Sequence, residues 1–255
     1  MYDAKESDTE GKVEGCMEKR RSIFRIVLFG AVLLASSACS VLAQSPGVEL
    51  DKALARLDAT AQKFKSAEAE VVWDNVQTQP IYDKDTQTGT VYFERRKGGV
   101  SMALHLKTLD GKPVPKEMVY DGGEFKLYEP MLKQETIFKT TGKQSEIESF
   151  LALGFGGSGA DLKKNWNVSY SGAETINGIQ TSRLVLLPLN DSTKQNVSKV
   201  ILWVDMANGI AIRQQSYDPS GNYRMVNYKI VHLNGGVPGN AFEIKTASGT
   251  RVINR

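Results

Sequence analysis

Hydrophobic residues after position 180 fall in short runs that polar turns separate. The runs cover residues 184–187, 199–204, 210–217 and 223–233, and they are rich in β-branched and aromatic side chains, which favours β-strands. The turns between them contain Asn, Asp, Ser and Gly, residues that tolerate turn dihedrals. Connections this short allow only antiparallel hairpins, because a parallel crossover needs about a dozen residues or more. The pattern therefore predicts a large antiparallel meander.

Similar runs extend the meander on both sides of this stretch. Residues 100–107 alternate strictly, with Met102 and Leu104 on one face and His105 on the other. Further strands are expected at residues 68–77, 89–96, 118–121, 125–128, 134–139 and 166–170, and near the C-terminus at residues 242–244 and 250–253.

One long stretch has helical periodicity instead. Residues 48–67 place Leu50, Leu54, Leu57 and Phe64 on one stripe with charged residues opposite. This pattern predicts an amphipathic helix that packs one face on the sheet.

A second, shorter helix is predicted in the middle of the meander. Ser145 and Glu148 have the spacing of a capping box, and the helix that they open presents Ile147, Phe150 and Leu151. Four glycines and one serine follow within residues 154–159. They lack the glycine spacing and the lysine of a phosphate-binding loop. We interpret the glycines as a hinge for the apolar helix, followed by a short helical piece at 160–164.

The N-terminal region has a different character. Residues 1–16 are polar and without apolar periodicity, so we expect disorder. A basic segment at 17–21, an apolar run at 23–35 and small residues up to Ala43 follow, which is the pattern of a secretory signal peptide. The apolar run contains Arg25 and is shorter than the ~20 residues of a membrane-spanning helix. We therefore expect export, removal of residues 1–43, and a single domain at 44–255.

Two cleavage sites compete. Cleavage after Ala43 leaves a soluble protein that begins at Gln44, whereas cleavage before Cys39 leaves a candidate lipid-anchored protein. Bacterial lipoproteins usually have Leu three residues before the modified Cys, and this chain has Ser36 there. The pattern favours the soluble periplasmic product, and the anchored form remains the alternative.

Composition excludes several classes of function. The net charge is +3 and the expected signal region contains equally many acidic and basic residues, so the mature chain lacks the basic footprint of a nucleic-acid-binding protein. Both cysteines, Cys16 and Cys39, precede Gln44, so a soluble mature form has no disulfide or cysteine metal site. His105 and His232 are the two histidines, and each stands alone in a predicted strand. We therefore expect no enzyme activity and no cofactor.

A surplus of apolar strand residues raises one further question. A single curved sheet covered by one long and one short helix can leave part of its concave face unfilled, which would form a cavity for an apolar ligand. An ordinary filled core fits the periodicity equally well.

Several motifs resemble the outer-membrane lipoprotein carrier (LolA) family. Residues 121–130, DGGEFKLYEP, are similar to the family's DG…YdP hairpin, and residues 89–95 are similar to its strand ending in Arg-Pro. Further similarity lies at 184–188, at 202–205 with Gly209, and around Phe242, so that the resemblance spans residues 48–253. It implies a mainly β fold with helices: an incomplete antiparallel β-barrel, closed by an α-helical lid.

The resemblance also implies a ligand and partners. The apolar interior would hold acyl chains of lipoproteins or other lipids, received from an inner-membrane ABC transporter and passed to an outer-membrane receptor by a monomeric carrier. The lid would consist of the first helix and residues 147–155. The residues expected to line the cavity and lid are Leu54, Leu57, Phe64, Trp73, Phe93, Met102, Leu104, Ile147, Phe150, Leu151 and Trp203.

Arg95 matches the family arginine that holds the lid shut by bonding to lid backbone. Arg96 stands where the family has Pro, so either arginine could have this role. The leading hypothesis is a periplasmic carrier without a catalytic step. The alternative is an envelope protein tethered through Cys39, in which the same half-barrel binds a lipid or a protein partner as a signal.

Overall fold

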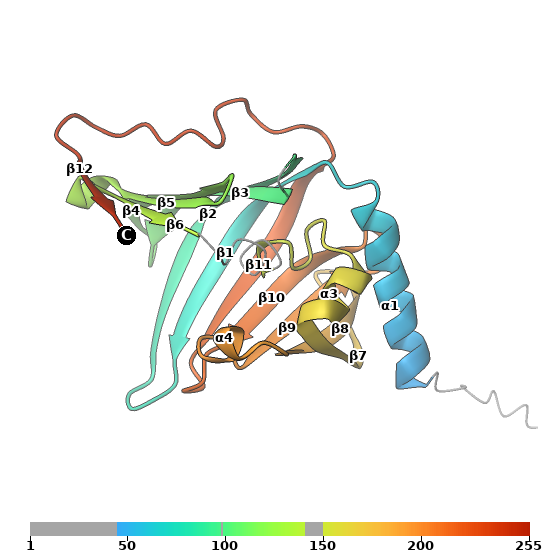
Figure 1. The fold of residues 1–255 in the computed structure, drawn as a ribbon. Helices are drawn as coiled ribbons and strands as arrows, with labels where there is room; N and C mark the ends of the chain where they lie inside the picture. The colour runs from blue at the N-terminus through green and yellow to red at the C-terminus, as the bar shows by residue number, and fades with distance from the viewer. Residues whose placement is uncertain (1–44, 98, 141–149) are drawn as a thin grey trace, which may run out of the picture. The chain divides into compact units, whose positions relative to one another are not determined.

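The computed structural model describes residues 45–97, 99–140 and 150–255, which form one curved sheet of 12 strands with few helices (Figure 1). The strand order is β12-β6-β5-β4-β3-β2-β1-β11-β10-β9-β8-β7, and the edge strands β12 and β7 do not pair with each other. The predicted mainly β, unclosed and largely antiparallel sheet is confirmed. The strands are β1 (Ser66–Gln77), β2 (Asp83–Arg96), β3 (Gly99–Leu109), β4 (Lys112–Asp121), β5 (Glu124–Glu129), β6 (Gln134–Lys139), β7 (Trp166–Ile176), β8 (Ile179–Pro188), β9 (Lys199–Asp205), β10 (Ile210–Tyr217), β11 (Tyr223–Leu233) and β12 (Arg251–Asn254).

Two meanders make up the sheet, β1 to β6 and β7 to β11, and antiparallel pairing of β1 with β11 joins them. The last strand departs from the predicted pattern, because β12 pairs parallel with β6. Residues 234–250 connect β11 to β12, and a connection of this length permits a parallel crossover.

The prediction of a strand at residues 242–244 is wrong. These residues lie outside any strand, and the guanidinium of Arg96 lies 4.1 Å from the ring centroid of Phe242. The aromatic side chain that favoured a strand in the sequence thus packs against a cation instead.

The helices whose bounds lie wholly in the described part of the chain are α1 (Pro46–Ala61), α3 (Gly159–Asn165), α4 (Asp191–Lys194) and a 3-10 turn, η1 (Pro130–Leu132). The first helix ends at Ala61, six residues before its predicted end. Beyond it the backbone already joins the sheet: Arg95 N donates to Lys65 O at 2.8 Å, and Lys65 N donates to Asn234 Oδ1 at 2.7 Å. Pairing with β2 and β11 therefore overrides the helical stripe. The predicted capping box and Ile147 lie outside the described residues.

The buried side chains form two main clusters. The first lies between α1 and the β8–β9 part of the sheet, where Leu54 and Leu57 pack with Leu184, Leu186 and Leu202. Burial of each of these leucines contributes about 2 kcal/mol of transfer free energy. The second lies under β1, β2 and β3 and includes Phe64, Phe93, Leu104 and Phe155.

Residues 150–157, called the covering segment below, connect to this second cluster. Phe150 and Leu151 are helical, and a series of turns follows. Gly154 has φ +83°, and a Cβ there would lie 2.3 Å from the Cβ of Ala211. Glycine therefore lets the segment lie directly on β10, where Ala211 N donates to Gly154 O at 3.0 Å. Whether these glycines act as a hinge stays a prediction.

Candidate ligand-binding cavity

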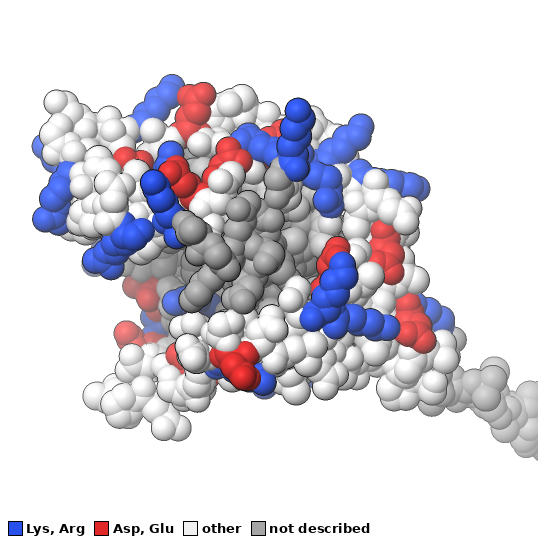
Figure 2. Space-filling view, viewed as in Figure 1, with Lys and Arg blue, Asp and Glu red and all other residues white. Residues whose placement is uncertain are grey.

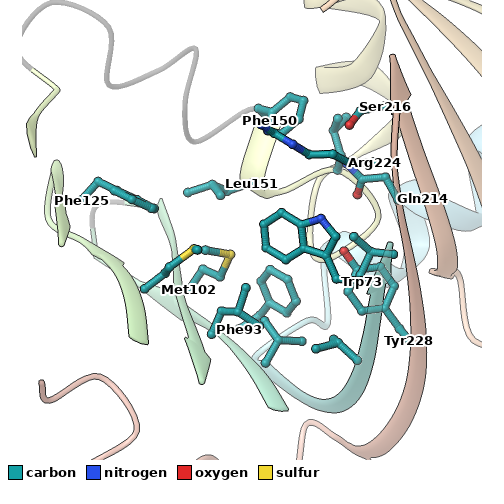
Figure 3. Close-up of a pocket in the computed structure, with 16 residues that line it drawn as sticks. Trp73, Phe93, Met102, Phe125, Phe150, Leu151, Gln214, Ser216, Arg224 and Tyr228 are labelled. Carbon is teal, nitrogen blue, oxygen red and sulfur yellow. The ribbon is translucent and has the colours of Figure 1, made fainter. Parts of the chain in front are cut away.

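An apolar cavity of about 210 Å³ lies between the sheet and the covering segment (Figure 3). Strands from both meanders form its walls. Its lining residues are Val71, Trp73, Val91, Phe93, Met102, Leu104, Met118, Phe125, Phe150, Leu151, Leu153, Gln214, Ser216, Arg224, Val226 and Tyr228.

Strand periodicity explains how the sheet supplies these side chains. Every second residue of a strand faces the same side, so Trp73 follows Val71 on β1 and Leu104 follows Met102 on β3. Strand β2 lies between β1 and β3 and adds Val91 and Phe93, and Phe93 pairs directly with Met102 of β3. The walls therefore belong to one hydrogen-bonded sheet.

The covering segment is fixed to the sheet by aromatic contacts. The ring of Phe155 stacks on Phe93 with centroids 4.2 Å apart and an interplanar angle of 9°, and it meets the edge of Tyr228 at 4.9 Å. Such pairs stabilise by about 0.5–1.5 kcal/mol beyond their buried area. Phe155 thus anchors the end of the segment, while Phe150 and Leu151 at its start line the cavity.

Arg95 links the covering segment to the end of α1. Its Nη2 donates to Gly156 O at 2.5 Å and to Ala61 O at 3.4 Å, and its Nε donates to Phe64 O at 3.3 Å. Arg96 makes other contacts, through ion pairs with Glu94 at 2.7 Å and Asp121 at 2.6 Å. Of the two neighbouring arginines, Arg95 is therefore the one bonded to this backbone.

The structure brings together six of the eleven side chains expected at the cavity: Trp73, Phe93, Met102, Leu104, Phe150 and Leu151. Leu54 and Leu57 instead pack in the cluster under α1, and Phe64 is buried beside the cavity in the second cluster. Ile147 lies outside the described residues.

Trp203 does not line the cavity. It pairs across strands with Arg213, whereas its neighbour Leu202 pairs with the cavity-lining Gln214. Since successive side chains alternate between faces, Trp203 lies on the opposite face of the sheet. There its Nε1 donates to Glu174 Oε2 at 2.6 Å.

The sequence reasoning missed the contribution of β10 and β11. Gln214, Ser216, Arg224 and Tyr228 all line the cavity. Their regular spacing of two residues within each predicted strand was the signal that could have found them.

Burial affects the ionisation of one cavity residue. Tyr228 is partly buried, and desolvation of its hydroxyl raises the pKa above the ordinary value. Among the described residues, no group of three or more His, Cys, Asp or Glu side chains could hold a metal ion. On the face seen in Figure 2, Lys and Arg side chains are interspersed with Asp and Glu.

A polar cavity of about 470 Å³ adjoins the apolar one, and the two share Phe150, Ser216 and Arg224. We call it the polar vestibule. Its further lining residues are Asn75, Val76, Gln77, Asp83, Asp85, Asn196, Val197, Tyr217, Asp218, Asn222 and Tyr223.

Comparison with solved structures finds chains of similar fold at low identity. An uncharacterized conserved protein from Thermus thermophilus is 13% identical over 83% of this chain and 100% of that one, with a TM-score of 0.48. A chain of the Pseudomonas aeruginosa MucA/MucB complex is 12% identical over 78% and 61%, with a TM-score of 0.40. The LolA superfamily protein NE2245 from Nitrosomonas europaea is 13% identical over 76% and 96%, with a TM-score of 0.35.

The sequence itself gives the family. No curated protein matches the chain significantly. The model of the MucB/RseB N-terminal domain matches residues 74–234, which is more than half of the 255 residues. The chain therefore belongs to the MucB/RseB N-terminal domain family.

Proposed function

We propose that this protein binds acyl chains of a lipid or lipoprotein in the apolar cavity and carries them through the bacterial periplasm. The observation that carries the proposal is the cavity itself, in which Trp73, Phe93, Met102 and Leu104 of the sheet face Leu151 of the covering segment. An apolar cavity with a few polar groups at one side is typical of a small-molecule site.

Acyl burial supplies enough free energy for capture. Each methylene group that leaves water contributes about 0.8 kcal/mol, so ten of them would contribute about 8 kcal/mol. A free energy of that size corresponds to a dissociation constant of about 1 µM. No catalytic step is part of the proposal.

The cavity volume argues that the covering segment moves when ligand binds. The cavity of about 210 Å³ is smaller than the ~300–1,000 Å³ of ordinary ligand sites. The sheet walls are hydrogen-bonded into place, whereas Phe150 and Leu151 belong to the covering segment. Outward displacement of these two side chains would enlarge the cavity without breaking strand pairing.

Fluorescence quenching tests the proposal directly. Bromine-labelled stearate should quench Trp73, and the Trp73→Phe variant should lose this response, because Trp166 and Trp203 lie elsewhere. Phe150→Glu and Leu151→Glu should each weaken binding about tenfold or more, since a carboxylate would then face the apolar cavity. Leu189→Glu is the matched control, because Leu189 is 48% exposed and lines neither cavity. Equal affinity for stearate in the wild type, Phe150→Glu, Leu151→Glu and Leu189→Glu would refute acyl binding at this site.

Export and delivery belong to the same proposal. Residues 1–43, the expected signal peptide, lie outside the described residues. No helix in the described part of the chain is long and apolar enough to cross a membrane. The inner-membrane ABC transporter and outer-membrane receptor of the resembling family would be the delivery partners.

A second candidate is a sensing module that binds a protein partner, tethered through Cys39. The family match favours it, because a solved structure in this family shows MucB in complex with MucA(peri). Expression of the full chain and a mass measurement of the mature protein separate the two: a carrier begins at Gln44, whereas the tethered form begins at an acylated Cys39. Cys39→Ala should then release only the tethered form from membranes.

A further inference from the structure

Polarity changes in the same direction along three neighbouring strands. The side chains that face the cavities run from apolar to polar along β1, β2 and β11 as the apolar cavity gives way to the polar vestibule. The series are Val71, Trp73, Asn75 and Gln77 on β1; Phe93, Val91, Asp85 and Asp83 on β2; and Tyr228, Val226 and Arg224 on β11, with Asn222 in the turn that precedes β11. An amphiphile would meet apolar walls at one end and polar walls at the other.

A row of four polar residues marks the boundary between the two cavities. Ser216 pairs with Arg224, Arg224 with Asn75, and Asn75 with Asp85, each directly across neighbouring strands. Strands lie about 4.8 Å apart, so the row crosses β10, β11, β1 and β2 without a gap. Figure 3 shows its Ser216 and Arg224 near Gln214, away from Met102 and Phe125.

Part of this row is held in place by hydrogen bonds. Trp73 Nε1 donates to Asn75 Oδ1 at 3.0 Å, and Asn75 Nδ2 donates to Asp85 Oδ1 at 2.8 Å. Asp85 Oδ1 also accepts a hydrogen bond from Gln87 Nε2 at 3.3 Å, so two donors hold this carboxylate oxygen in place. The guanidinium of Arg224 makes no hydrogen bond or ion pair with another described residue, so its five donors remain available to a ligand.

The charges of the vestibule decide which headgroup fits. Arg224 is the one cation among its described lining residues, beside the carboxylates of Asp83, Asp85 and Asp218. Asp218 already accepts hydrogen bonds from Ser220 and Asn222 in its own turn. A purely anionic headgroup would gain from Arg224 but would be repelled by the carboxylates of Asp83 and Asp85. A headgroup with one anionic and one cationic group avoids that repulsion.

We propose that the polar vestibule binds a zwitterionic headgroup that joins a phosphate diester to a primary amine, as in phosphoethanolamine lipids. The phosphate accepts hydrogen bonds from Arg224, the ammonium group donates to Asp85 and Asp83, and the acyl chain occupies the apolar cavity. This assignment rests on the proposed function, because it takes the acyl chain from it and adds the class of headgroup.

Calorimetric titration with three single-chain lipids tests the assignment, each used below its micelle concentration. The probes share one oleoyl chain and differ in headgroup: phosphoethanolamine, which is zwitterionic; phosphoglycerol, which is anionic; and glycerol, which is neutral. We expect the phosphoethanolamine lipid to bind most tightly. Arg224→Gln should weaken its binding about tenfold, as expected for loss of a charge-assisted hydrogen bond, and should leave the glycerol lipid unchanged.

Two further variants complete the design. Asp85→Asn should weaken binding of the phosphoethanolamine lipid but not of the phosphoglycerol lipid, because only the phosphoethanolamine lipid carries an ammonium group. Lys229→Gln is the matched control, because Lys229 lies on β11 with its side chain 79% exposed and bonded to Glu70. It should change no affinity.

The outcomes separate failure of this assignment from failure of the proposed function. If the glycerol lipid does not bind the wild-type protein, acyl binding itself is refuted. If all three lipids bind equally and Arg224→Gln has no effect, the acyl site stands and the headgroup assignment is overturned. If the phosphoglycerol lipid binds more tightly than the phosphoethanolamine lipid, and Asp85→Asn changes neither affinity, the vestibule binds a simple anionic headgroup and the zwitterionic assignment is overturned.

Discussion

Replacing Arg95 by Met should loosen the covering segment while leaving the sheet intact. Methionine retains most of the aliphatic stem but removes the donors that reach Gly156, Ala61 and Phe64. Of these three bonds, the one to Gly156 joins the covering segment to the body of the domain. The substitution therefore removes a contact that exists only when the segment lies against the sheet.

The expected size of the effect follows from the geometry. The bond to Gly156 is short at 2.5 Å, whereas the other two are 3.3 and 3.4 Å long and weak. A hydrogen bond from a charged donor contributes about 1.5–3 kcal/mol when buried, and solvent screening of the exposed Arg95 reduces this to about 1–2 kcal/mol. The equilibrium constant for opening of the segment should rise by a factor of about 5 to 30.

Hydrogen exchange measures this opening directly. The amide of Ala211 on β10 donates to Gly154 O at 3.0 Å, so its exchange reports release of the segment from the sheet. The amides of Leu153, Phe155 and Gly157 donate to Phe150 O or Ala152 O within the segment, so their exchange reports its unfolding once it is released. Arg96→Met is the control, because Arg96 bonds to Glu94 and Asp121 instead. If Arg95→Met and Arg96→Met give the same exchange at these amides, Arg95 does not hold the segment and the reasoning is refuted.

Two further predictions concern the same region. Gly154→Ala combines a positive φ with a Cβ 2.3 Å from that of Ala211 and should lower the free energy of unfolding, measured by denaturant titration, by about 2–4 kcal/mol. The control variant Gly249→Ala has φ +78° but open space around the new Cβ, so it should lose only about 1 kcal/mol. Equal losses in the two variants would contradict the packing argument. Because burial raises the pKa of Tyr228, the folded protein holds that proton more tightly than the unfolded chain, so the free energy of unfolding should fall as pH rises above about 10. Tyr228→Phe should flatten this fall in urea titrations between about pH 9 and 11, whereas an unchanged fall would assign it to another group.

The alternation within strands made part of the cavity predictable from the sequence. Trp73, Phe93, Met102 and Leu104 were all expected there, and all four line it. A strand has a fixed period of two, so a correctly located strand places its side chains on the correct face once one of them is assigned. The same rule would have added Tyr228 had β11 been assigned to the concave wall.

Hydrophobic alternation does not show which side chains face the cavity where a strand is buried on both faces. On β9, Val200, Leu202, Trp203 and Val204 are all buried, so the run is apolar without alternation and does not reveal which side faces the cavity. Trp203 was expected in the cavity, yet it packs with Ile176 and Ile212 on the other face. Side-chain size decides how much area is buried but not on which side of the sheet.

The sequence left open whether the concave face holds a cavity or a filled core, and the described structure contains both. Over β8 and β9, the stripe of α1 fills the space with Leu54 and Leu57. Over β1, β2 and β3, the part of the cover that the structure describes is the covering segment, from which Phe150, Leu151 and Leu153 line the cavity. The apolar cavity lies under the covering segment, whereas α1 contributes Leu54 and Leu57 to the core. Ligand entry should therefore require movement of the covering segment alone, and a disulfide that fixes α1 to β8 should leave acyl binding unchanged.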